Sequence, residues 1–167
     1  MKSRNLEFML ITALLFISII LAAANYLDYL EFHIRVGPFF IHHWFSLIGS
    51  FYIGIYTPIY YYFKRKNPSL VRRLLMFHIL GNVTSFGLIS IHFTQQISRP
   101  AAFYPDLQTG IVLFPTVALL TLTGYSMKYR FFPKHWKTLR SIHVGLTTAF
   151  YLTIWVHILH GLGWINA

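Results

Sequence analysis

Four of the nine histidines form two equally spaced pairs, and imidazole is the commonest metal ligand among protein side chains. His78 and His92 lie fourteen positions apart, and His143 and His157 have the same separation. Fourteen residues of an α-helix make roughly four turns and rise about 21 Å, so both members of a pair would lie on one face of their helix. The spacing therefore predicts two ligand levels, each of which takes one imidazole from each pair.

Two opposed imidazoles are the axial ligands that a six-coordinate haem iron needs, and haem is apolar enough to fill the space between helices of a bundle. Copper or zinc sites usually gather three or four ligands at one depth, often with thiolate or carboxylate. The chain has no cysteine, which also excludes disulfides and the covalent attachment of c-type haem. A single histidine would more often be a polar group bonded to a neighbouring helix, but the repeated spacing argues against that. We therefore predict two b-type haems, whose iron ligands are His78, His92, His143 and His157.

Five long apolar segments must position these histidines. The sequence of 167 residues is 56% hydrophobic and only 11% charged, whereas a soluble domain carries about a quarter charged residues. Each segment is long enough to cross about 30 Å of hydrocarbon as a helix. The segments cover residues 6–27, 39–63, 70–97, 107–127 and 139–161. We predict an all-α integral membrane protein, a bundle of about five transmembrane helices that forms a single haem-binding domain over residues 1–167.

The basic residues lie almost entirely on one side of the predicted helices. With the N-terminus inside, twelve of the fourteen Lys and Arg residues fall on the cytoplasmic side, and only Arg35 and Arg99 fall outside. Cytoplasmic loops carry an excess of Lys and Arg, so the asymmetry predicts a cytoplasmic N-terminus and an outer C-terminus in a multi-pass protein of the plasma membrane. It also accounts for the net charge of +10 without a nucleic-acid partner.

This orientation assigns the histidines to two depths. The third and fifth segments are separated by one complete span and therefore run in the same direction. His78 and His143 then lie near the cytoplasmic side, while His92 and His157 lie near the outer side. The sequence thus predicts an inner haem between the first two and an outer haem between the second two.

Further cationic and imidazole side chains flank the predicted ligands. Haem propionates need cationic or hydrogen-bonding partners near each membrane surface. The candidates for propionate or acceptor-side contacts are Arg72, Arg73, Arg140, Arg99, His42, His43 and His160. The arginines would equally serve orientation and lipid headgroup binding, and His42 and His43 would equally serve an interfacial role. His160 also rivals His157 as the outer ligand, although the matched spacing favours His157.

The two H-x13-H motifs, on the third and fifth helices of a small bundle, resemble the ferric-reductase-like transmembrane domain. The resemblance covers roughly residues 39–161 and implies bis-histidine haem b at His78 with His143 and at His92 with His157. It further implies electron flow from the cytoplasmic face to an acceptor outside. Ferric reductases and NADPH oxidases of this family continue into a flavin- and NADPH-binding domain that this sequence lacks. We therefore expect a separate electron donor, either a flavoprotein or a quinol, and a component of an oxidoreductase rather than a complete enzyme.

Two other functions remain open at this point. The first is a quinol-oxidising cytochrome b subunit of a larger respiratory complex, which would need a quinone pocket near one haem. The second is a haem-free membrane transporter or structural subunit, whose histidines carry protons or merely pack between helices. The presence or absence of haem separates the second from the others.

Overall fold

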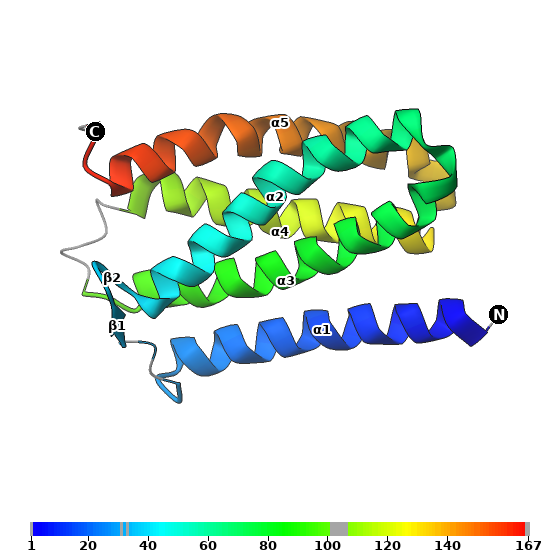
Figure 1. Ribbon diagram of the computed structural model, residues 1–167. Coiled ribbons are helices and arrows are strands. Elements are labelled where there is room, and N and C mark those ends of the chain that lie inside the picture. Colours follow the sequence, from blue (N-terminus) through cyan, green and yellow to red (C-terminus); the bar gives the residue numbers. More distant parts are fainter. Residues whose placement is uncertain (1, 31, 33, 101–106, 166–167) are drawn as a thin grey trace. The chain divides into compact units, whose positions relative to one another are not determined.

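The computed structural model describes residues 2–30, 32, 34–100 and 107–165, except for the side chains of residues 2–4 and 108. Five long helices account for most of these residues (Figure 1): α1 (Lys2–Tyr26), α2 (Ile41–Lys66), α3 (Val71–Ile97), α4 (Gln108–Tyr129) and α5 (Trp136–Gly161). Each helix covers one of the five predicted segments, which confirms the all-α architecture. The chain divides into two compact units, Met1–Ser98 and Arg99–Ala167. The prediction of one haem-binding domain is not tested by this division.

Within the described residues, four of the five helices are long and apolar enough to cross a membrane, namely α1, α3, α4 and α5. Helix α2 is 26 residues long, but its histidines, tyrosines and basic last turn lower its mean hydropathy. Large apolar side chains on the helices are strongly exposed, for example Met9 at 65% and Leu152 at 70%. Apolar surface of this kind suits contact with lipid tails rather than with water. The protein is therefore a multi-pass membrane protein.

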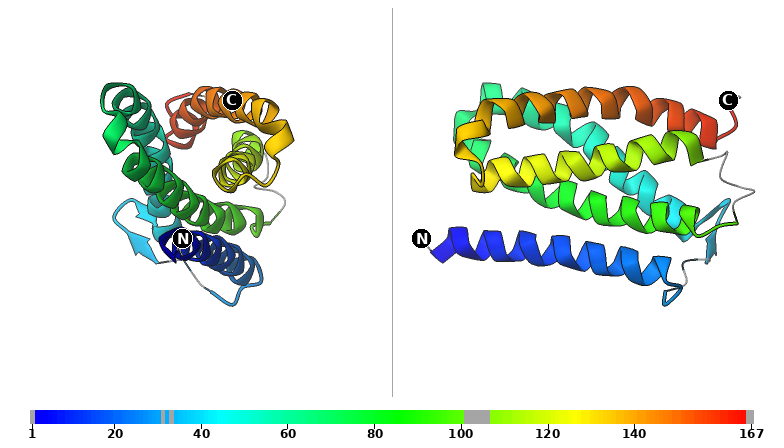
Figure 2. Two further views of the ribbon diagram at one scale, coloured as in Figure 1. Left: turned by 90° about the vertical axis from the view of Figure 1, so that its right-hand side faces the viewer. Right: turned by 180° about the vertical axis from the view of Figure 1, so that it is seen from behind.

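In the first unit, α3 packs against both α1 and α2 (Figures 1 and 2). The side chain of Asn25, fully buried near the end of α1, donates hydrogen bonds to the Ile91 carbonyl at 3.1 Å and to the Thr94 hydroxyl at 2.8 Å. On the other side, Gly49 of α2 lies so close to α3 that a Cβ atom there would be 3.0 Å from the Ser85 carbonyl oxygen. Small residues allow such close helix approach in membranes. Helix α3, which carries His78 and His92, is thus held from two sides.

A two-stranded hairpin precedes α2 and fixes where that helix begins. Strands β1 (Arg35–Val36) and β2 (Phe39–Phe40) pair antiparallel, and the turn between them contains Gly37 with a φ of 62°, a conformation that favours glycine. The Trp44 indole of α2 donates a hydrogen bond to the Val36 carbonyl at 2.9 Å. The hairpin therefore anchors the first turn of α2, which carries His42 and His43.

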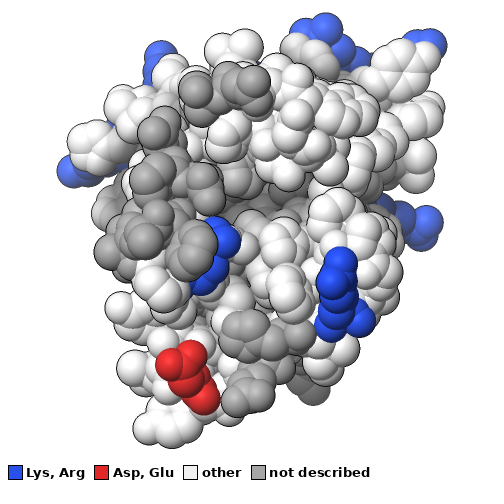
Figure 3. Space-filling view, turned by 90° about the vertical axis from the view of Figure 1, so that its left-hand side faces the viewer, with Lys and Arg blue, Asp and Glu red and all other residues white. Residues whose placement is uncertain are grey.

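On the face shown in Figure 3, uncharged atoms predominate and the charged side chains stand apart from one another.

The second unit is an antiparallel hairpin of α4 and α5 (Figures 1 and 2). Helix α4 ends at Tyr129, and the next residue, Arg130, has a left-handed conformation with a φ of 55° that turns the chain out of the helix. A short 3-10 turn, η3 (Pro133–His135), leads into α5. Because the helices run in opposite directions, the end of α4 lies beside the start of α5. This register decides which α4 residues meet His143 and His157.

Candidate haem-ligand and metal sites

His143 of α5 is held by a threonine of α4. The Thr123 hydroxyl oxygen lies 2.9 Å from Nδ1 of His143, and it also lies 2.7 Å from the Leu119 carbonyl oxygen. A hydroxyl group has one proton, and the carbonyl can only accept it. The Nδ1–H group of His143 must therefore donate to Thr123, which leaves a lone pair on Nε2. An imidazole in this tautomer is ready to bind a metal through Nε2.

His157 is held in the same way, four turns along α5. The Thr109 hydroxyl oxygen lies 2.9 Å from Nδ1 of His157. The distance and the atom pair are those found at His143. Helix α4 thus presents one threonine hydroxyl to each of these two histidines of α5.

A glycine follows each of these threonines and makes room for the imidazole ring. A Cβ atom on Gly124 would lie 3.2 Å from Cε1 of His143, and one on Gly110 would lie 3.4 Å from Cε1 of His157. The rings therefore lie directly against the backbone of α4. The two Thr-Gly pairs are fourteen residues apart, like the histidines they contact. Sequence reasoning missed these partners, although the matching spacing of Thr-Gly in the preceding segment was a readable indication of them.

His78 has different surroundings, which come mainly from the tyrosines of α2. Its ring stacks on Tyr60, with centroids 4.8 Å apart and planes inclined by 14°, and more loosely on Tyr56 at 6.4 Å. Its Nε2 atom lies 3.3 Å from the side-chain nitrogen of Asn82, one turn further along α3. The Tyr56 hydroxyl donates to the Leu74 carbonyl of α3 at 3.1 Å. At least two tyrosines of α2 therefore pack on α3.

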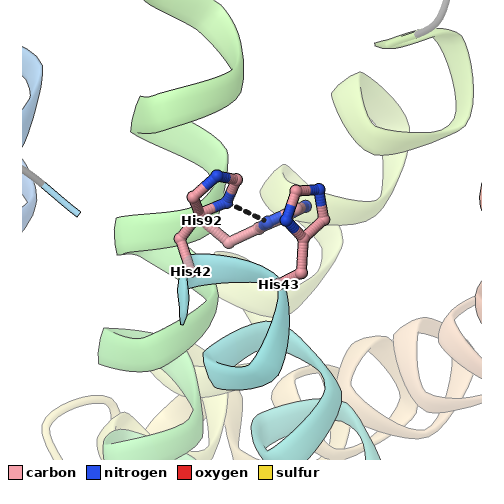
Figure 4. A group of neighbouring side chains, drawn as sticks. All are labelled: His42, His43 and His92. Carbon is pink, nitrogen blue, oxygen red and sulfur yellow. Dashed lines mark hydrogen bonds between the residues drawn. The ribbon is translucent and has the colours of Figure 1, made fainter. Parts of the chain in front are cut away.

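His92 lies in a group of three histidines together with His42 and His43 (Figure 4). The Nδ1 atoms of His42 and His92 are 3.1 Å apart, and the ring centroids of His42 and His43 are 4.1 Å apart. One ligand nitrogen can be chosen from each residue so that all three lie within 4.8 Å of one another. The sequence suggested His42 and His43 as propionate or acceptor-side contacts but gave no sign that they meet His92.

The other predicted contact residues lie at helix ends. Arg72 and Arg73 are exposed in the first turn of α3, and Arg140 is exposed in the early part of α5. Arg99 follows α3, and His160 lies in the last turn of α5, three residues beyond His157. Their roles toward propionates remain predictions. The pairing of α3 histidines with α5 histidines also remains a prediction, since it joins residues of the two units.

The chain matches no protein-family model, no curated protein and no solved structure. The resemblance to the ferric-reductase-like transmembrane domain therefore stays a prediction. Fold and sites together define a class, a multi-pass all-α membrane protein with four clusters of side chains arranged around histidines.

Proposed function

We propose that the protein is a transmembrane electron-transfer component that holds two b-type haems, one between His78 and His143 and one between His92 and His157. When bound, each haem would supply an iron centre that takes up and releases one electron. The chain's own task is to hold the two groups in series within a membrane. No acid, base or nucleophile is required of the protein for this reaction.

The observation that carries the proposal is the repeated contact between α4 and α5. His143 and His157 each have Nδ1 at 2.9 Å from a threonine hydroxyl and Cε1 against a glycine. Histidine ligands in metalloproteins almost always donate their other ring N–H to a partner, which fixes the tautomer and the ring orientation. A histidine that merely packs between helices needs one hydrogen bond, but it does not need the same partner and the same glycine twice.

The α3 histidines support the proposal to different degrees. Nδ1 of His92 faces His42 at 3.1 Å, so an iron would be bound through Nε2, as in α5. At His78 it is Nε2 that lies near Asn82, at the long distance of 3.3 Å. Axial binding through Nε2 of His78 would therefore displace the Asn82 amide. The stacked ring of Tyr60 would hold the imidazole in place during that exchange.

Orientation and partners follow from the charges. Basic residues concentrate in the predicted cytoplasmic segments, and in this orientation His78 and His143 would lie on the inner side of a plasma membrane. Electrons would enter there from a flavoprotein or a quinol and leave at the His92 end to an outer acceptor. The candidates for propionate contacts are Arg72, Arg73 and Arg140 inside, and Arg99, His42, His43 and His160 outside.

The test is the absorption spectrum of the purified protein, isolated through an affinity tag that contains no histidine. We expect a b-type α-band after reduction with dithionite, and two haems per chain in the pyridine haemochrome assay. His78→Ala and His143→Ala should each remove one haem, while His92→Ala and His157→Ala should each remove the other.

The matched control is His135→Ala, which removes a histidine outside the predicted ligands and contact residues. A purified, folded protein without haem would contradict the proposal and favour a haem-free transporter or structural subunit. Loss of one haem in His160→Ala with none in His157→Ala would transfer the outer ligand role to His160.

A further inference from the structure

The start of α2 and the later part of α3 bring three imidazoles together, and within the described residues no carboxylate belongs to this group. His42 is buried, with 4% of its surface exposed, and His43 and His92 are half-buried. Figure 4 shows the three rings converging, with His42 and His43 coming from the first turn of α2 and His92 from α3. Imidazole nitrogens that lie this close together are suited to sharing a proton or a metal ion.

The hairpin before α2 holds two of these rings from behind. Phe40 of β2 stacks on His42, with centroids 5.8 Å apart and an interplanar angle of 7°, and it stacks on His43 at 6.2 Å. Phe39 lies 6.0 Å from His43. Since the hairpin is also tied to Trp44 through the Val36 carbonyl, the rings are supported from a fixed element. Support of this kind keeps the rings close together before a ligand arrives.

The nitrogen separations suit the coordination shell of a transition-metal ion. Zinc–nitrogen bonds of 2.0–2.1 Å in a tetrahedral shell place neighbouring nitrogens about 3.3 Å apart. The Nδ1 atoms of His42 and His92 are already 3.1 Å apart, and all three ligand atoms lie within 4.8 Å. A side-chain rotation at His43, which is only half-buried, would close the remaining distance.

We propose that His42, His43 and His92 form a binding site for a divalent transition-metal ion of the Zn²⁺, Cu²⁺ or Ni²⁺ class. Imidazole nitrogen suits these ions, whereas Mg²⁺ and Ca²⁺ require oxygen ligands that the three side chains do not offer. Three protein ligands leave a fourth position for water or another small ligand. The site goes beyond the proposed function and does not depend on it.

His92 belongs to both proposals, and its ring offers a different nitrogen to each. Nδ1 faces His42, while Nε2 lies on the other side of the ring. An imidazole that binds a metal through each ring nitrogen carries a proton on neither of them. Simultaneous occupation of both sites would therefore make His92 an imidazolate. Metal binding is therefore measured in the presence and in the absence of the outer haem.

The experiment uses the full chain in detergent, purified without a histidine tag, stripped with a chelator and titrated with Zn²⁺. We expect one Zn²⁺ per chain by elemental analysis, and an affinity that falls at least tenfold in both His42→Ala and His43→Ala. His135→Ala, which removes an exposed histidine of the other unit, should bind as the parent does. Substitution of Co²⁺ gives visible bands that report nitrogen ligands directly.

His43→Ala serves as the second variant because loss of the buried His42 ring could weaken folding, and helix content is measured for both. His157→Ala should lose the outer haem and keep its zinc, which separates this site from the proposed function. If the parent binds no more Zn²⁺ than the double variant His42→Ala/His43→Ala, the metal site is wrong. Loss of haem in His42→Ala, without zinc binding by the parent, would likewise overturn it and make His42 a partner of a haem ligand.

Discussion

The two helices that carry the equally spaced histidines differ in how their neighbours hold those histidines. On α5, His143 and His157 make the same two contacts with α4. A threonine hydroxyl lies at Nδ1 of each ring, and a glycine lies against Cε1. On α3, the two rings have unlike neighbours. His78 lies beside tyrosines of α2 and Asn82 of α3 itself, and His92 lies beside two further histidines of α2.

The difference shows that equal spacing specifies equal positions but not equal chemistry. The α4–α5 unit repeats one arrangement at two levels, so both of its imidazoles should behave alike as ligands. In the first unit, His78 packs against tyrosine rings, whereas His92 lies beside two additional imidazoles. Differences between an inner and an outer haem would therefore originate on α3.

The largest expected effect comes from removing the threonine hydroxyls. Thr123→Val and Thr109→Val each leave Nδ1 of one histidine without its hydroxyl partner, and loss of such outer partners typically weakens metal binding by about 10–100-fold. We expect each valine variant to lose one haem selectively, measured by haem-to-protein ratio and by the rate of haem transfer to an excess of an apo-acceptor protein.

Thr123→Ser and Thr109→Ser retain the hydroxyl and should behave like the parent. If the valine variants also retain both haems with unchanged transfer rates, the two levels of α5 are not organised by their threonines, and the contrast with α3 disappears.

A smaller effect is expected where tyrosine packs on α3. A Cβ atom on Gly81 would overlap the ring of Tyr52, whose hydroxyl donates to the Phe77 carbonyl at 2.7 Å. Overpacking typically costs about 1–3 kcal/mol. Gly81→Ala should lower the free energy of unfolding by an amount near the lower limit of that range, because the Tyr52 side chain can rotate away. Thermal unfolding in detergent measures it.

The matched control is Gly145→Ala, since a Cβ atom there would meet nothing within 4 Å. In that variant only the gain in helix propensity is left, so its stability should be unchanged or slightly higher. Equal melting temperatures for the two variants would show that the tyrosine packing around this part of α3 contributes little.

The smallest effect distinguishes the two otherwise equivalent levels of α5. An added methyl on Gly124 would be 3.2 Å from the His143 ring and would push it by a few tenths of an ångström, whereas on Gly110 the 3.4 Å separation from His157 is an ordinary contact. Gly124→Ala should weaken the inner haem by less than about tenfold, below the effect of losing the hydroxyl. Gly110→Ala should leave both haems unchanged.

The reduced absorption spectrum and the haem transfer rate report both glycine variants. Should Gly110→Ala prove the more damaging of the two, the rings would be held less tightly at the His143 level than the contacts indicate.

Much of the fold was predictable because hydrophobic length and charge placement are properties of the chain itself. The five apolar segments appear as helices with similar bounds, from 139–161 expected to Trp136–Gly161 observed in the last. The second segment departs most from expectation, since α2 is a long helix that is not among the four apolar enough to span by composition. The tyrosines and histidines of α2 contact α3 instead, and a measure of apolar character along the sequence does not detect such contacts.

By itself, the sequence determined the number of helices, the direction suggested by the Lys and Arg residues, and the two pairs of histidines fourteen residues apart. Only the tertiary structure decided what surrounds each ring. Contacts between helices depend on the register of one helix against the next, and the antiparallel register of α4 and α5 brings Thr109 to His157 and Thr123 to His143. In the same way, the hairpin before α2 holds His42 and His43 near His92. One of the two equally spaced α3 histidines thereby lies in a group of three imidazoles, which the spacing alone did not indicate.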